Sequence, residues 1–127
     1  MKKIITGTWA VGKQIINVKL SIIIFKEDES HIVFCPALNL TGYGDSDPEA
    51  LQSFEVVLGE YFNYTTNKKT LETDLEKMGW NLGKSMRKPA TPPDMSYLLN
   101  HNEDFRNIFN NHAFRKEDTR VAIPVFV

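Results

Sequence analysis

The alternation of side chains along Gln14–Lys26 constrains the fold more than any other feature of the sequence. Apolar residues occupy every second position of Ile16–Ile24, and polar side chains separate them over the first half. A period of two is that of a β-strand with one buried face. Because Ile23 and Phe25 interrupt the polar series, we expect the second face of this strand to be covered towards its end.

Two further β-type runs follow within the first 46 residues. A charged turn, Lys26–Ser30, leads into His31–Cys35, which a proline ends, so the first two runs predict a β-hairpin. Leu38–Tyr43 predicts a third short strand, with glycines on both sides of Tyr43 where the backbone must bend or be closely approached. A weaker β pattern over Lys3–Ala10 predicts an edge strand.

A helix-start signal stands at Ser46–Ala50. We expect Asp47 to accept hydrogen bonds from the free amides of the first turn, and Pro48 to occupy the first helical position. A second, shorter helix is predicted over Thr70–Lys77, ended by Gly79. Apolar residues at helical spacing predict the face of the first helix that packs on the sheet: Leu51, Phe54, Leu58, Tyr61 and Phe62.

The chain beyond residue 83 changes in composition. Residues 84–93 hold three of the six prolines and three positive charges, which predicts an extended linker. Helical spacing over residues 94–109, begun by Asp94, predicts one helix or a broken pair. Pro124 lies within a terminal β-type run and predicts an edge strand or an isolated arm. We therefore divide the chain into an α+β domain (1–83), a proline-rich linker (84–93) and a helical extension with a terminal strand (94–127).

The composition favours a cytoplasmic globular protein without metal, cofactor or disulfide chemistry. Of the 127 residues, 42% are hydrophobic and 24% are charged, and the net charge of -1 gives no strong overall field for nucleic acid or anionic lipid. The start of the chain carries no signal-peptide core, and the apolar runs are far shorter than the roughly 20 residues of a membrane helix. The three histidines have no metal-ligand spacing, so no metal site is predicted. Cys35, the single cysteine, is best explained as a core residue.

Two groups of carboxylates are the candidate binding residues. They lie in the predicted hairpin turn and around the predicted helix start: Glu27, Asp28 and Glu29, and Asp45, Asp47 and Glu49. A solvated turn and helix capping explain the same residues without a partner. Residues 1–83 carry eight basic and eleven acidic side chains, whereas residues 84–127 carry seven and five. The acidic first part favours a basic protein partner.

The order of motifs over residues 15–62 resembles the HicB antitoxins of bacterial toxin–antitoxin modules. The first motif is the charged turn. The second is Ile32–Leu38, which ends in Cys-Pro-Ala-Leu. The third is Gly44–Leu51, which contains Gly-Asp-Ser and ends in Pro-Glu-Ala-Leu. The resemblance implies an α+β fold, β-β-β-α-β, in which one long helix packs on a small antiparallel or mixed sheet related to ribonuclease H. Ribonuclease H chemistry needs metal-binding carboxylates, one of them in the first long strand, and Gln14–Phe25 contains no Asp or Glu. We therefore expect a non-catalytic protein.

For function, the resemblance implies a type II antitoxin that binds and masks a small basic toxin of the HicA kind, which cleaves messenger RNA. The two carboxylate groups are then the candidate contacts with the toxin. The second part of the chain would mediate formation of a homodimer or higher oligomer, or would contact the promoter of its own operon. Residues 89–127 match neither DNA-binding module of the family, so the residues themselves do not support DNA binding.

An alternative is a stand-alone small-molecule-binding domain, or an orphan domain, on the same scaffold. Its pocket would lie between the sheet and the helix Pro48–Phe62, lined by Phe34, Cys35 and Tyr43. The sequence leaves these alternatives open because a fold does not fix a function.

Overall fold

The computed structural model of the chain describes residues 4–5, 7, 15–82 and 90–124. The described helices and strands occur in this order: β1 (Ile4–Ile5), β2 (Ile15–Glu27), β3 (Ser30–Cys35), β4 (Leu40–Gly44), α1 (Asp47–Lys68), α2 (Leu71–Lys77), α3 (Met95–His101), α4 (Glu103–Asn111) and β5 (Phe114–Pro124). The predicted α+β class is confirmed. The three strands predicted before the long helix are β2, β3 and β4, and the short β1 lies within the weaker edge strand predicted over Lys3–Ala10, of which residues 3, 6 and 8–10 lie outside the described part of the chain.

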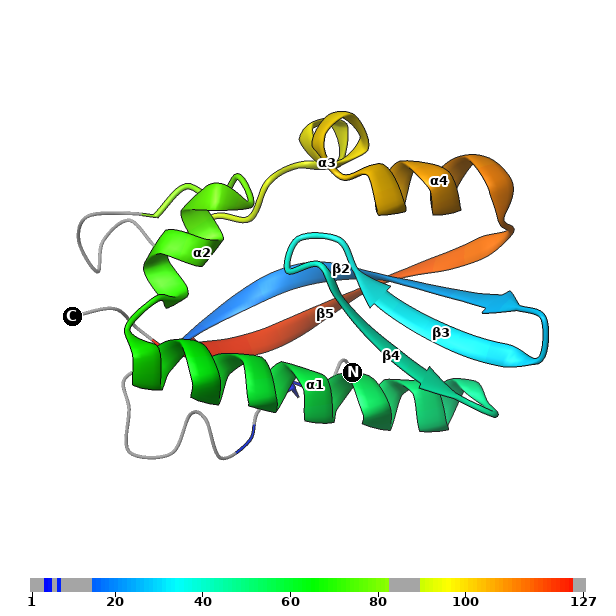
Figure 1. The fold of residues 1–127 in the computed structure, drawn as a ribbon, viewed down its shortest axis with the longest axis horizontal. Helices are drawn as coiled ribbons and strands as arrows, with labels where there is room; N and C mark the ends of the chain where they lie inside the picture. Colours follow the sequence, from blue (N-terminus) through cyan, green and yellow to red (C-terminus); the bar gives the residue numbers. More distant parts are fainter. Residues whose placement is uncertain (1–3, 6, 8–14, 83–89, 125–127) are drawn as a thin grey trace.

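The strands form one sheet in the order β1-β5-β2-β3-β4 (Figure 1). All neighbouring strands are antiparallel except β1 and β5, which are parallel. β2 pairs with β3 on one side and with the whole length of β5 on the other, so it is a central strand. β4 and the short β1 form the two edges.

The two faces of β2 are buried by different helices. Its even-numbered residues from Val18 to Ile24 face α1, whose Phe54, Leu58 and Phe62 are fully buried against them. On the other face, α3 and α4 cover only the end of the strand and pack there on Ile23 and Phe25. The expectation that the second face becomes covered towards the end of the strand is confirmed.

Gly42 and Gly44 allow α1 to lie directly on β4. A Cβ atom at Gly42 would lie 2.7 Å from the Cα of Phe54, and one at Gly44 would lie 2.6 Å from the backbone nitrogen of Ala50. Both separations are shorter than side chains tolerate. Close backbone approach, one of the two explanations that the sequence offered, therefore accounts for these glycines.

The first helix begins one residue earlier than predicted, and its cap is different. Ser46 is the N-cap, and its hydroxyl accepts a hydrogen bond from the backbone N–H of Glu49 at 3.2 Å. The expectation that Asp47 caps the helix is wrong, because its carboxylate is bonded to residues of two strands instead.

The remaining helices follow the sequence pattern closely. α2 ends before Gly79, whose φ of +95° is the predicted left-handed terminator. The run after Asp94 is a broken pair, and Asn102 separates the two helices. The Asn102 side chain accepts a hydrogen bond from the backbone N–H of Phe105, so it caps α4 where α3 ends.

The C-terminal strand is the largest difference from the sequence prediction. The terminal β-type segment is confirmed as a strand, but β5 begins at Phe114 and lies between β1 and β2 rather than at an edge or as an isolated arm. Pro124 is its last residue, opposite Ile15, so the missing N–H falls at the end of the ladder.

Of the predicted linker, residues 84–89 lie outside the described part of the chain. Thr91, which lies inside the predicted linker, exchanges two backbone hydrogen bonds with Asn81, so this part of the linker is held against the chain before it.

Candidate functional site

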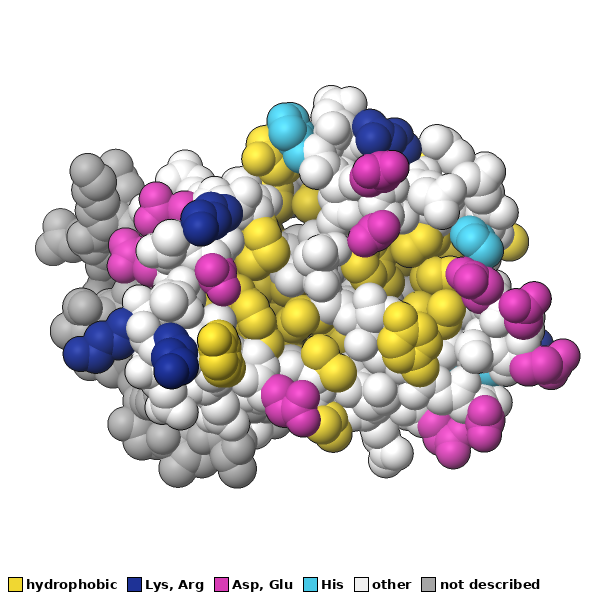
Figure 2. Space-filling view, viewed as in Figure 1, with side chains coloured by type: hydrophobic (Ala, Val, Ile, Leu, Met, Phe, Trp, Pro, Cys, Tyr) yellow, Lys and Arg dark blue, Asp and Glu magenta, His cyan; other side chains and the backbone are white. Residues whose placement is uncertain are grey.

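The structure brings the two predicted carboxylate groups to one end of the molecule. Glu27 pairs with Ser30 at the tip of the β2–β3 hairpin, and His31 pairs with Gly44 where β4 leads into α1. The hairpin turn and the start of the helix therefore lie next to each other. Figure 2 shows Asp and Glu side chains gathered at this end, on the right of the view. We call Glu27, Asp28, Glu29, Asp45, Asp47 and Glu49 the acidic end.

Only part of the acidic end is free to bind a partner. The Glu49 carboxylate accepts a hydrogen bond from the backbone N–H of Asp45 at 2.9 Å, and Glu27 lies 3.8 Å from the His112 ring. Asp28 holds the left-handed conformation of the turn, with φ of 55°. Within the described residues, the side chains of Asp28, Glu29 and Asp45 have no hydrogen bond or ion pair, and all three are exposed.

Asp47 joins three secondary-structure elements at the acidic end. Its carboxylate accepts a hydrogen bond from His31 Nδ1 on β3 at 2.7 Å and one from the Arg115 guanidinium on β5 at 3.3 Å. These two donors, His31 first, hold the pKa of Asp47 below its ordinary value. Arg115 also binds Glu117 at 3.0 Å, and the two carboxylates raise its pKa. Asp47 is thus occupied within the chain.

A groove lies between α1 and β5 and ends at this cluster. Its floor is Ile22 and Ile24 of β2, and its walls are two periodic sets of side chains: Asp47, Leu51 and Glu55 on one face of α1, and Arg115, Glu117 and Thr119 on β5. It holds two cavities, of about 530 and 480 Å³. We call it the α1–β5 groove. An apolar floor beneath charged walls suits a protein segment with both apolar and charged side chains.

Sequence reasoning missed His31, Arg115 and Glu117 as members of the site. Arg115, Lys116, Glu117 and Asp118 are four charged residues in a row, so no alternation of apolar and polar side chains extends the terminal strand back to residue 114. Their proximity to Asp47 was not predictable either, because it depends on how β5 pairs with β2.

The three residues predicted to line a small-molecule pocket do not share one. Phe34 and Cys35 are neighbours on β3 and point to opposite faces of the sheet, Phe34 towards α3 and α4, and Cys35 towards α1. Tyr43 points away from α1 and is 60% exposed. Burial raises the pKa of the Cys35 thiol to about 12, so Cys35 is an inert core residue.

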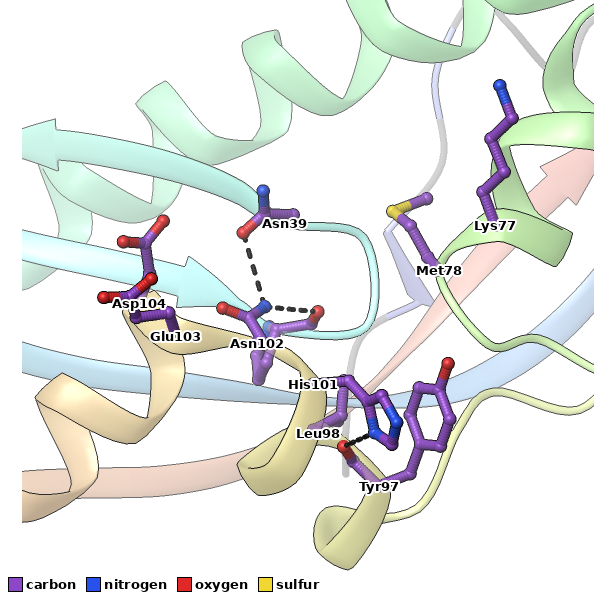
Figure 3. Close-up of a pocket in the computed structure, with 10 residues that line it drawn as sticks. Asn39, Lys77, Met78, Tyr97, Leu98, His101, Asn102, Glu103 and Asp104 are labelled. Atoms are coloured by element: carbon purple, nitrogen blue, oxygen red, sulfur yellow. Dashed lines mark hydrogen bonds between the residues drawn. The ribbon is translucent and has the colours of Figure 1, made fainter.

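A separate cavity of about 330 Å³ lies where α2, α3 and α4 meet the β3–β4 turn (Figure 3). Tyr97 and His101 stack on one side of it, with ring centroids 4.0 Å apart and an angle of 14° between the rings. Gly79 leaves room for the Tyr97 ring, which a Cβ atom there would strike. Lys77 of α2 also lines it, with its ammonium group pointing away from the two rings, and Glu103 and Asp104 line it from the start of α4 (Figure 3).

Within the described ranges, no group of three or more His, Cys, Asp or Glu side chains could hold a metal ion. None of the helices found in those ranges is both long enough and apolar enough to cross a membrane. No protein-family model matches the chain, and no curated protein or solved structure matches it either.

Proposed function

We propose that the protein is a non-catalytic, antitoxin-like protein of the cytoplasm that binds and masks a small basic ribonuclease through its acidic end. The observation that carries this proposal is the convergence of two carboxylate groups, distant in the sequence, on one end of the molecule. Complementary charge steers a basic partner to such a surface and fixes its orientation. The resemblance of residues 15–62 to the HicB antitoxins supplies the class of partner.

The division of roles within the acidic end follows from the bonds of each residue. Asp28, Glu29 and Asp45 are the contacts proposed for lysine and arginine side chains of the toxin, because they are exposed and have no partner within the described residues. Asp47 instead fixes the start of α1 to β3 and β5, which keeps the two turns together before the partner binds. A surface arranged in advance loses less entropy on binding.

The test is co-expression of the tagged protein with the small basic reading frame next to its gene. We expect the tagged protein to retain the basic product and to relieve its toxicity. The combined variant D28K/E29K/D45K should lose both effects. The matched control E72K/E76K reverses two exposed charges on α2 and should keep both. Absence of a retained basic product, or equal retention by the two variants, would contradict the proposal.

A second candidate function, binding of a small molecule, rests on the cavity of Figure 3 rather than on the residues that the sequence named. Its volume of about 330 Å³ lies within the range of small-molecule sites, and the Tyr97 and His101 rings offer a flat aromatic wall. A thermal-shift screen of aromatic metabolites on the protein and on its Tyr97→Ala variant tests it. A compound that stabilises both proteins equally does not bind at this cavity.

A further inference from the structure

Within the part of the chain that the structure describes, the outer edge of β5 is paired over only part of its length. β2 pairs with β5 from Phe114 to Pro124, but on the other side β1 pairs only with Arg120 and Val121. Among the described residues, no strand pairs with the outer side of Phe114–Thr119. Successive residues of a strand direct their backbone N–H and C=O groups alternately to the strand on one side and to the strand on the other. Half of the residues in Phe114–Thr119 therefore direct these groups away from β2, to the open side. Such an edge is a template for another strand.

The charged side chains along this edge of β5 restrict which strands can pair with it. Arg115 and Glu117 point to the face of the sheet that α1 covers, and Lys116 and Asp118 point to the other face. Each face thus carries one positive and one negative charge, two residues apart. Charged edge residues discourage indiscriminate pairing, because like charges directly opposite each other destabilise a strand pair.

We infer that the occupant of this edge is a second copy of the same chain, which pairs antiparallel along Phe114–Asp118 about a two-fold axis at Lys116. This register places Arg115 opposite Glu117 of the second copy, and Glu117 opposite its Arg115. The same pair of charges thereby forms twice, as a symmetric interface requires. The five-stranded sheet of each copy continues into that of the other, with α1 of both copies on the same face.

The neighbouring registers are less favourable. A shift that centres the pair on Glu117 sets two glutamates opposite each other and pairs Lys116 with Asp118 twice, so its charges are as well matched. It is excluded by space, because it brings Phe114 of the second copy to the place where Ile4 pairs with Arg120. A shift that centres the pair on Arg115 sets two arginines opposite each other and forms no pair of opposite charges within Phe114–Asp118 to offset them. Registers centred between residues would put the α1 faces of the two copies on opposite sides of the sheet.

Lys116 meets its own copy at the axis, and the structure already compensates its charge. Its Nζ atom lies 3.1 Å from the Asp118 carboxylate of the same chain. Asp118 also accepts a hydrogen bond from Ser21 at 3.0 Å, which fixes it on the sheet. The dimer brings the two α1–β5 grooves side by side, while the exposed carboxylates of the hairpin turn stay free. It does not depend on the proposed toxin partner.

The first test measures the mass of the full chain in solution by size-exclusion chromatography with light scattering. We expect a dimer of twice 14.6 kDa. R115E and E117R should each be monomers, because each places like charges opposite each other twice, and the double variant R115E/E117R should regain the dimer. Asp47→Asn is the matched control. It removes an internal partner of Arg115 without changing the edge, and it should remain a dimer.

The second test detects the edge contact itself and decides the question if a charge variant fails to fold. Lys116→Cys should form a disulfide between two chains on mild oxidation, because directly opposite residues of antiparallel strands lie within disulfide reach. The only native cysteine, Cys35, is buried and should not react. Asn17 of β2 is exposed on the same face of the sheet as Lys116 but lies away from the open edge, so Asn17→Cys should give no cross-linked dimer.

Three results would overturn the inference. They are a monomeric native chain with no Lys116→Cys cross-link, a dimer that survives both single charge reversals, and a chain that dimerises only after residues 1–3 are removed. The last would assign the edge to the chain's own first residues. Loss of toxin binding without loss of the dimer would count against the proposed contacts alone, so failure of either proposal can be told from failure of the other.

Discussion

Substitution of Gly42 by alanine tests how closely α1 packs on the sheet. The added Cβ would strike the backbone nitrogen of Phe54 and would lie 2.7 Å from its Cα, where ordinary contact begins at 3.4 Å, so helix and strand must separate by at least about 0.7 Å. The obstructing atoms belong to the helix backbone and cannot rotate away. We therefore expect a loss of about 3 kcal/mol of unfolding free energy, the upper part of the range for overpacked sites. The melting temperature should fall by roughly 10 °C.

The assay is urea unfolding followed by circular dichroism, with Thr41→Ala as the control. Thr41 is the neighbouring residue of β4, points away from α1 and is partly exposed, so its truncation should cost less than about 1 kcal/mol. Surface substitutions usually change the unfolding free energy by no more than about 0.5 kcal/mol. If Gly42→Ala lowers the unfolding free energy by no more than this, the close packing of α1 on β4 is refuted.

Three further predictions concern single side chains. Trp80→Phe removes the indole N–H that donates to the buried carbonyl of Ala37 at 2.7 Å, and we expect a loss of about 1–3 kcal/mol in urea unfolding; an unchanged midpoint would contradict the bond. Cys35 should not react with a thiol reagent at pH 8 until the chain unfolds, because burial raises its pKa to about 12; rapid labelling of the folded chain would contradict its burial. The hydrogen bond from His31 lowers the pKa of Asp47 from its ordinary 3.8, so Asp47 stabilises the fold above pH 4 and loses this effect as the pH falls through the lowered pKa. The native chain should therefore exceed Asp47→Asn in unfolding free energy at pH 6, and the difference should shrink as the pH falls below the ordinary pKa of 3.8; a difference independent of pH would exclude this cause.

The elements with a complete local signal were predictable from the sequence. The long strand β2 was predictable because its period of two extends over most of its length, and Ile23 and Phe25 even indicated where its second face becomes buried. The helices α1 and α2 were predictable because apolar spacing, a start signal and Gly79 as a terminator act within a few residues of each other. Boundary errors were small at Ser46, where two adjacent residues can each cap a helix.

The position of β5 was not predictable, because strand pairing joins residues far apart in the chain. Its residues Arg115–Asp118 are charged on both faces, so no hydrophobic alternation marks them as strand. They form a strand because their backbone groups pair with those of β2. The buried side chains of β5 lie at its other end, at Val121 and Ile123. The prediction that the terminal β-type run is an edge strand or an isolated arm was wrong for the same reason.

By itself, the sequence determined the class of the fold, the main helices and strands, and the two carboxylate groups, all of which depend on neighbours along the chain. Only the tertiary structure decided that those groups meet at one end, that Asp47 is bound by His31 and Arg115, and that β5 lies inside the sheet. These features depend on which strand pairs with which, and in what register. Local propensity does not encode that choice, because the burial of both faces of the sheet selects it as a whole.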